Sequence, residues 1–342
     1  MEISQLRTLI HVAELGSLSK AADRLHIAQP ALSRQIRLLE EELGARLFDR
    51  HGRGMILTDQ GQDVLRHALR VMAELEEIRA SVSDEDAPLR GHVSVGMPPT
   101  VSDILAEPLV AAFRETHPEA TLRIVSAYSA YLLDWMHRGE VDAAILYDPR
   151  SARTLRVQPL LEEVLFLIGP PDAGLSQDVP VDFGDLEDER LLLPSEGHGL
   201  RKILDRCAGE RGFALRVPVE ADSYSTLKQL VQAGQGSTIL PRAPIHRDLV
   251  LGQLCAAPLQ NPVPTRRLIL AWPTDRPVPR LARFAGQVIA SNVSLLVRQG
   301  VWPGRLPTEQ ADTDQAARSA GRRRRPAGDG RPSPRAAAQR RG

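Results

Sequence analysis

The fold is decided by residues 16–50, which read GSLSKAADRLHIAQPALSRQIRLLEEELGARLFDR. This stretch predicts two short helices joined by a turn. Ser17 and Ser19 carry hydroxyls that can cap the start of the first helix. The second helix opens with Gln29 and Pro30, and a proline in a first helical turn loses no hydrogen bond because that amide has no partner there.

The second helix has two chemically different faces. At about 100° per residue, one narrow arc carries only apolar side chains, namely Leu32, Ile36, Leu39 and Leu43. The opposite side carries Gln29, Pro30, Ser33, Arg34 and Arg37. Arginine, glutamine and serine are side chains that read base edges. The pattern therefore predicts a helix-turn-helix whose second helix enters the major groove, and the alternative is an ordinary amphipathic helix with a solvated polar face.

The order of residue types in 21–50 distinguishes these two interpretations. The pattern A-A-D-R-L-H-I-A-Q-P-A-L-S-R-Q-I-R-x-L-E-x-x-L-G-x-x-L-F-x-R resembles the DNA-binding signature of LysR-type transcriptional regulators. The resemblance implies a sequence-specific DNA-binding protein. Ala28 departs from the pattern, because many members carry Ser or Thr there as the cap of the reading helix. This departure weakens the start of the helix without changing the assignment.

A helix is expected before this stretch and a hairpin after it. Residues 1–15 carry apolar side chains at helical spacing, and short strands are expected at 45–48 and 55–57. The turn between these strands holds Arg50 and Arg53. We interpret it as a wing that grips the phosphate backbone while the helix specifies sequence, with a plain exposed turn as the alternative. The candidate DNA contacts are Ser19, Gln29, Pro30, Ser33, Arg34, Arg37, Arg50 and Arg53.

A long helix is expected from the cap at Thr58 to about residue 83. Apolar residues recur there at steps of four and three, namely Val64, Ala68, Val71, Leu75, Ile78 and Val82. This repeat is typical of a coiled-coil seam, which favours a homodimer through the linker helix, and burial within one chain is the alternative. Two reading helices held apart in this way predict an operator that is an interrupted palindrome. The resemblance implies that the working unit is usually a tetramer.

Strand-like and helix-like segments alternate after residue 88. Strands are expected at 92–96, 121–127, 143–147, 164–169, 190–193, 217–221, 237–240 and 267–272, and helices at 102–116, 129–138, 199–212, 223–233 and 279–299. Such alternation predicts parallel sheets covered by helices on both faces. The length suits two similar lobes, so the predicted class is an α/β protein with an N-terminal all-α winged helix-turn-helix. The region resembles the two-lobed effector-binding domain of LysR-type regulators, which is related to periplasmic solute-binding proteins.

Small hydroxyl side chains stand where predicted strands end and helices begin. In open α/β sheets ligands bind at such positions, and the residues concerned are Thr100, Ser129 and Ser195. By the resemblance, they line the pocket between the lobes and suit a small carboxylate effector; a role as helix caps is the alternative. The stretch LPSEGHGLR resembles that of nitrogen-assimilation-control-type regulators, which adds His198 as a candidate. Tyr224 is a further candidate for the same pocket.

Composition excludes several classes of protein. The chain carries 43 basic and 43 acidic residues, so any DNA affinity comes from where the charges stand. Cys207 and Cys255 lack metal-ligand spacing; reduced thiols are expected, with a redox switch as the alternative. No cofactor, metal site or catalytic residue is expected, since Ser195 lies in no G-x-S-x-G elbow. Without a membrane span or signal peptide in the sequence, a cytoplasmic location is expected.

The predicted organisation has four parts. Residues 1–58 form the DNA-binding domain, 59–88 the linker and dimerisation helix, 89–301 the effector-binding domain, and 302–342 a disordered arginine-rich tail. The tail either adds sequence-independent DNA affinity or is inert. The predicted function is a LysR-type transcriptional regulator, not an enzyme, controlled by a small molecule bound between the lobes. The alternative is a solute-binding protein without a regulatory role.

Overall fold

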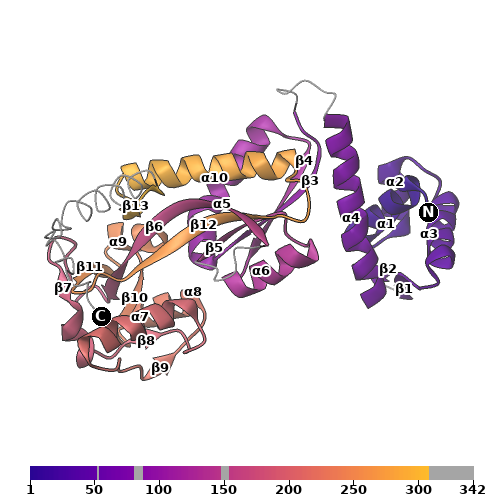
Figure 1. Ribbon diagram of the computed structural model, residues 1–342. Helices are drawn as coiled ribbons and strands as arrows, with labels where there is room; N and C mark the ends of the chain where they lie inside the picture. Colours follow the sequence, from indigo (N-terminus) through magenta and orange to yellow (C-terminus); the bar gives the residue numbers. More distant parts are fainter. Residues whose placement is uncertain (52–53, 81–87, 148–153, 308–342) are drawn as a thin grey trace, which may run out of the picture.

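The computed structural model describes residues 1–51, 54–80, 88–147 and 154–307. Three helices and a hairpin form the N-terminal unit, with bounds α1 Ile3–Leu15, α2 Leu18–Leu25, α3 Gln29–Leu43, β1 Phe48–His51 and β2 Gly54–Leu57. Helix α4 (Asp59–Ala80) leads from this unit towards an elongated α/β part (Figure 1). The arginine-rich tail lies outside the described residues from 308 onward.

The ends of the reading helix follow from local chemistry. The Ser17 hydroxyl accepts the Lys20 amide at the start of α2, whereas Ala28 at the cap of α3 makes no side-chain bond. Helix α3 ends at Gly44, whose φ of 65° lies in the left-handed region that glycine tolerates. The apolar arc packs into the core of the unit through Leu32, Ile36 and Leu39.

The hairpin begins later than the expected strand at 45–48. The backbone amides of Leu47 and Phe48 both donate to the Glu40 carboxylate, at 2.8 and 3.3 Å. These bonds tie the chain after α3 back to that helix, so the ladder starts only where Phe48 pairs with Leu57. The sequence pattern identifies the apolar residues of this segment, but it does not show that the Glu40 carboxylate accepts their backbone amides.

The apolar stripe of helix α4 packs against the N-terminal unit only in part. The Thr58 hydroxyl accepts the Gly61 amide at 2.9 Å, as expected for the cap. Ala68 is buried against the N-terminal unit, so part of the stripe packs within the chain. Val71 and Ile78 remain 42% and 64% exposed, which leaves the other part uncovered in the single chain. Val82 lies outside the described residues.

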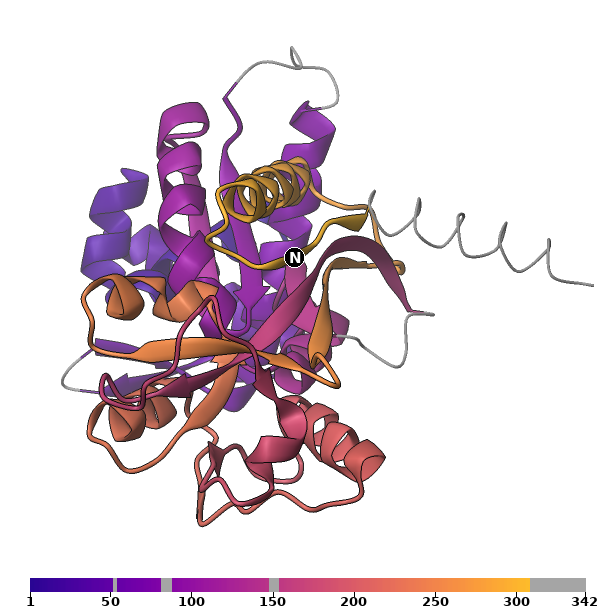
Figure 2. The same cartoon turned by 90° about the vertical axis from the view of Figure 1, so that its left-hand side faces the viewer.

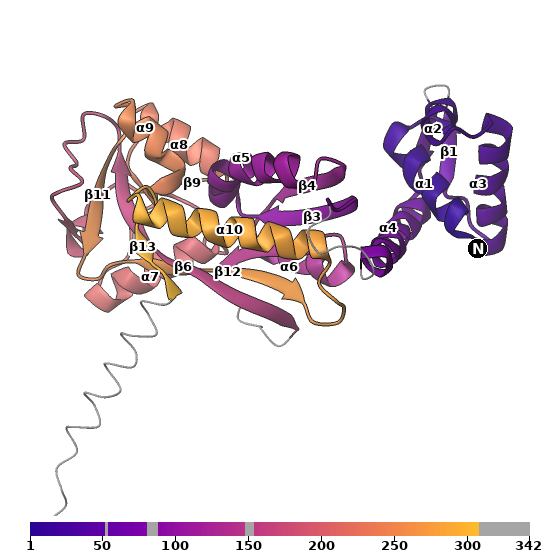
Figure 3. The same ribbon diagram turned by 90° about the horizontal axis from the view of Figure 1, so that it is seen from above.

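The first lobe is a sheet covered on both faces. Its strands are β3 Gly91–Met97, β4 Ala120–Ser126, β5 Ala143–Tyr147 and β12 Thr265–Pro273, and its helices are α5 Pro99–Thr116, α6 Ser129–Arg138 and α10 Arg280–Arg298. Ala143 and Ile145 face α5 and α10, whereas Ala144 and Leu146 face α6. Figure 3 shows α5 and α10 lying along the same side of the sheet.

The second lobe is built around the end of one long strand, β6 Leu155–Gly169. Its other elements are β7 Val181–Asp182, η1 Phe183–Glu187, β8 Leu192–Leu193, α7 Gly199–Arg211, β9 Val219–Glu220, α8 Tyr224–Gln232, β10 Thr238–Pro241, η2 Ala243–Ile245, α9 His246–Val250 and β11 Cys255–Gln260. The short β13 Gly304–Arg305 pairs with β6. In Figures 1 and 2, α7 lies below the crossing strands, whereas α9 lies beside them.

The expectation of parallel sheets is wrong in part. Strands β3, β4 and β5 are parallel, but β12 runs antiparallel to both β5 and β6, and β10 and β11 run antiparallel to β6. The reason is that β6 continues from the first lobe into the second, and the returning strands β11 and β12 pair with it in opposite direction, β11 along 166–169 and β12 along 155–164. Residues 155–159 include polar, exposed positions and Pro159, so the apolar pattern reveals only the later half of β6. No helix in the described parts of the chain has the length and apolarity that a bilayer crossing requires.

Candidate DNA interface and effector site

The polar face of α3 is turned outward. Gln29, Pro30, Arg34 and Arg37 are exposed and Ser33 is half-buried, while the opposite arc is buried. In Figures 1 and 3, α3 lies at the outer edge of the N-terminal unit, away from the α/β lobes. Leu43 differs from the prediction, since it is 41% exposed. It stands one turn beyond Leu39, where the helix has passed the end of the small core.

The contacts on this face leave its donors accessible. The Ser19 hydroxyl donates to Gln29 Oε1 at 3.3 Å, which joins the start of α2 to the start of α3. Arg37 Nε lies 3.5 Å from Glu41 Oε1 in an exposed pair, which contributes little to stability. Arg34 has no ion pair within the described residues. Guanidinium, amide and hydroxyl groups therefore stand together on one accessible surface.

The structure describes only part of the predicted wing. Arg50 lies in β1, where its backbone pairs with Met55 of β2. Arg53 lies outside the described residues, together with Gly52. The hairpin is connected to α1 by the Met55 amide, which donates to the Gly16 carbonyl at 2.8 Å. This bond ties β2 to the turn between α1 and α2.

Two predicted effector residues meet at Tyr147, the last residue of β5. The Thr100 hydroxyl, in the first turn of α5, lies 3.0 Å from the Tyr147 hydroxyl. Ser129 is the first residue of α6, and its Oγ accepts the Tyr147 amide at 3.0 Å. Burial raises the pKa of Tyr147, so its hydroxyl stays protonated and able to donate. The structure thus brings Thr100 and Ser129 together around a residue that was not predicted.

A buried arginine lies on the same tyrosine. The Arg266 guanidinium carbon is 3.7 Å from the centre of the Tyr147 ring, a cation–π contact. Its Nε is paired with Glu163, whose other oxygen accepts the Trp302 indole N–H at 2.7 Å. Arg266 Nη2 is buried and has no hydrogen-bond partner among the described residues. A buried donor of this kind is rare in native proteins, so this atom is a candidate group for binding a ligand.

Ser195 and His198 contribute from the second lobe. The Ser195 amide and hydroxyl both donate to Asp222 Oδ1, at 2.9 and 2.8 Å, and these bonds lower the pKa of Asp222. His198, not Ser195, is the cap of α7, since its Nδ1 accepts the Leu200 amide at 3.1 Å. Its ring meets the Tyr128 ring edge to face at 5.0 Å, a contact between the two lobes. Burial lowers the pKa of His198, which favours its neutral form.

Tyr224 is not placed with these residues. Its side chain is buried in the core of the second lobe, and its hydroxyl donates to the Pro244 carbonyl at 3.0 Å. The sequence places Tyr224 at the start of a helix, and such a position is compatible with a buried core residue as well as with a ligand contact. The residues that sequence reasoning missed are Tyr128, Tyr147, Glu163, Asp222 and Arg266. A charged pair inside otherwise apolar strands was the available signal for Glu163 and Arg266.

The contacts of Ser195 do not form a hydrolase triad. Its hydroxyl is bonded to Asp222, and the His198 nitrogen that faces the backbone is occupied by the Leu200 amide. No group of three or more metal-ligating side chains occurs in the described part of the chain. Cys207 and Cys255 are both free thiols there.

Comparison with known proteins identifies both units. The model of the bacterial regulatory helix-turn-helix protein, lysR family, matches residues 3–62, and that of the LysR substrate binding domain matches residues 86–292. The HTH-type transcriptional regulator BbuR of Bordetella bronchiseptica is 31% identical over 304 residues, which cover 89% of this chain and 94% of that protein. The nitrogen assimilation regulatory protein nac of Escherichia coli is 32% identical, with coverage of 71% and 79%.

The fold has solved counterparts as well. The structure of the Corynebacterium glutamicum OxyR C206 mutant matches with a TM-score of 0.63 and 27% identity, over 87% of this chain and 96% of that one. These matches confirm the predicted fold class and exclude the alternative of a solute-binding protein without a regulatory role. The chain belongs to the LysR family and is a DNA-binding transcriptional regulator with an effector-binding domain.

Proposed function

We propose that this regulator reads its operator through the outward face of α3. The observation that carries the proposal is the accessible group of Gln29, Ser33, Arg34 and Arg37 on one side of a helix whose other side is buried. Arginine pairs with guanine and glutamine with adenine in the major groove, and Ser19 positions Gln29. Pro30 adds an apolar surface at the start of the helix. Arg50 and Arg53 are proposed to hold the phosphate backbone.

The proposed assembly is a homodimer through α4, and two such dimers would form a tetramer, as is usual in the family. The exposed apolar residues Val71 and Ile78 on α4 support this proposal, because a second α4 would remove them from water. The operator would then be an interrupted palindrome. We assign residues 1–58 to DNA binding, 59–88 to the linker, 89–301 to effector binding and 302–342 to the tail. Since the operator lies in the genome, we place the protein in the cytoplasm.

The proposed effector is a small carboxylate held between the lobes. Arg266 Nη2 supplies a buried cationic donor, and Thr100, Ser129 and Tyr147 supply hydroxyls beside it. Ser195 and His198 would contact the effector from the second lobe, whereas Tyr224 would act only by packing behind them. A ligand that binds across the lobes changes the operator complex only through different affinities for the two arrangements of the subunits.

The DNA proposal is tested with Arg34→Ala and a matched control, Arg114→Ala. Arg114 is exposed on α5, so both changes remove one exposed guanidinium. We expect Arg34→Ala to weaken specific binding by about 1–3 kcal/mol, the typical worth of a bidentate base contact. The control should leave binding unchanged. Operator footprints that are the same for Arg34→Ala and the parent chain would overturn the proposal.

The effector proposal is tested by thermal shift of the whole protein with a series of small carboxylates. A carboxylate that binds only the folded state raises the melting temperature. We expect the shift to disappear in Thr100→Val, which keeps the shape of the side chain and removes its hydroxyl. Ser102→Val is the control, two residues further along the same helix. Loss of the shift in both variants, or in neither, would contradict the proposed site.

A further inference from the structure

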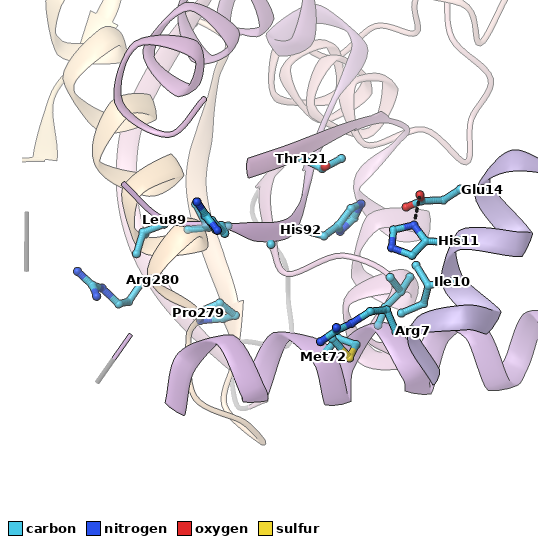
Figure 4. A pocket seen from close by; sticks show the side chains of 14 residues that line it. Arg7, Ile10, His11, Glu14, Met72, Leu89, His92, Thr121, Pro279 and Arg280 are labelled. Carbon is cyan, nitrogen blue, oxygen red and sulfur yellow. Dashed lines mark ion pairs between the residues drawn. The ribbon is translucent and has the colours of Figure 1, made fainter. Parts of the chain in front are cut away.

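A cavity lies between the N-terminal unit and the first lobe, far from the proposed effector site. Its volume is about 210 Å³, the space of about seven water molecules. Helices α1 and α4 supply one wall, and β3, β4 and the start of α10 supply the other (Figure 4). A molecule bound there would therefore touch the DNA-binding unit and the effector-binding domain at once.

The two units also contact each other directly. Arg66 Nε of α4 lies 3.8 Å from Glu140 Oε1 of the first lobe. The side chain of Arg70 packs against Gly139, so closely that a Cβ atom at that glycine would come within 2.9 Å of the Arg70 Cδ. These contacts hold α4 against the first lobe, and the cavity is bounded by two units that already rest on each other.

The lining combines apolar walls with basic groups. The apolar residues are Ile10, Leu69, Met72, Leu89, Pro279 and Leu281. The basic residues are Arg7, Arg90 and Arg280, whereas Glu14 is the single acidic residue in the described lining.

Arg90 is paired with Glu119 at 2.7 Å, but Arg7 has no ion pair within the described residues. In Figure 4 the Arg7 side chain extends from α1 across Met72. Ligand sites typically show such apolar walls with a few polar groups.

Two histidines from the two units lie at the inner side of the cavity. Figure 4 shows the His11 ring beside Glu14 and close to the His92 ring. His11 Nδ1 is buried without a hydrogen-bond partner among the described residues, although Glu14 Oε2 lies 3.4 Å away. Burial lowers the pKa of His92, so its ring offers a neutral N–H donor or an unprotonated nitrogen. The cavity is thus lined by polar ring nitrogens from both units.

We propose that this junction cavity is a second ligand site, which takes a small amphipathic monocarboxylate. The carboxylate would accept from Arg7 and the histidine rings, and the apolar body would lie against Met72 and Leu281. Because the occupant contacts both units, it favours the arrangement in which the DNA-binding unit rests on the first lobe. The site would regulate DNA binding independently of the effector between the lobes.

The proposal is tested by calorimetry on the whole protein with hexanoate as the probe and hexanamide as its uncharged counterpart. The background is the double variant Glu163→Gln, Arg266→Gln, which removes the charges of the proposed effector site. We expect hexanoate to bind this background saturably at millimolar concentration, and hexanamide about tenfold more weakly. In the same background Arg7→Gln should weaken hexanoate about tenfold, and Met72→Trp, which fills the cavity, should abolish binding. Arg298→Gln, at the far end of α10, is the matched control and should change nothing.

Three outcomes would overturn the proposal. The first is a parent chain that shows no saturable binding of hexanoate. In the second, binding is lost in the double variant, which would place the ligand at the effector site and leave the proposed function intact. In the third, Arg7→Gln and Met72→Trp bind as the background does. Arg7→Gln changes an exposed side chain and keeps the test valid if Met72→Trp does not fold.

Discussion

At the scale of single residues, the ion pair Glu163–Arg266 is buried at a cost in free energy, and it also supplies a donor for the proposed effector. Both side chains are almost fully buried, and Arg266 Nη2 has no hydrogen-bond partner in the described structure. Arg266→Gln alone leaves the Glu163 carboxylate buried without its cation. We expect this change to destabilise the protein by about 3–5 kcal/mol, as for other broken buried pairs. Urea unfolding of the whole protein measures the loss.

The matched variant for this prediction is Glu163→Gln, Arg266→Gln, in which both charges are removed. Two neutral amides bury at lower cost than one unpaired carboxylate, so the double variant should recover much of the loss. The Trp302 indole N–H keeps an acceptor at position 163. A double variant that is less stable than Arg266→Gln would show that the pair contributes more than it costs.

At the scale of elements, the cap of α3 tests how well local rules apply. Ala28 has an extended conformation, with φ −60° and ψ 132°, and makes no side-chain bond at the cap. A serine there can accept an amide of the first turn. We expect Ala28→Ser to stabilise the N-terminal unit by about 0.5–1 kcal/mol. Ala31→Ser, inside the same helix and also exposed, is the control and should give no gain. Equal stabilities by chemical unfolding would contradict the cap argument.

The elements also show what the sequence could predict. The helices α1–α8 and α10 follow from apolar periodicity and end signals, because their packing surfaces are contiguous in sequence. The short strands β7, β11 and β13 were missed, since each is defined by the strand it pairs with. The first half of β6 was missed for the same reason. Of the effector residues, Thr100 and Ser129 could be placed from helix starts, but Arg266 lies far along the chain and reaches them only through tertiary structure.

At the scale of the whole molecule, buried histidines couple stability to pH. Burial lowers the pKa values of His92, His117 and His198 below that of an exposed histidine. The unfolded chain therefore binds more protons once the pH falls below about 6.5. The free energy of unfolding should be highest above that value and should decline as the pH falls through the lowered values. Burial of Asp142, which raises its pKa, opposes the decline.

His117 offers a specific test of this decline. Its Nδ1 accepts the Leu89 amide at 3.2 Å, and protonation would remove that acceptor. In His117→Gln the side-chain carbonyl oxygen can accept the same amide at every pH. We expect a smaller loss of stability between about pH 7.5 and about pH 5.5 than in the parent chain, measured by urea unfolding at both values. His137→Gln, an exposed histidine, serves as the control. Identical pH profiles for the parent and His117→Gln would contradict the assignment.

Strand β6 joins the two lobes and limits the way in which they can move. It pairs with β12 of the first lobe along Leu155–Val164 and with β10 and β11 of the second lobe along Leu165–Gly169. Because each lobe keeps its own ladder on the same strand, a movement between the lobes is confined to the crossing near residue 165. We expect an effector to act by turning one lobe against the other about that crossing, which breaks neither ladder.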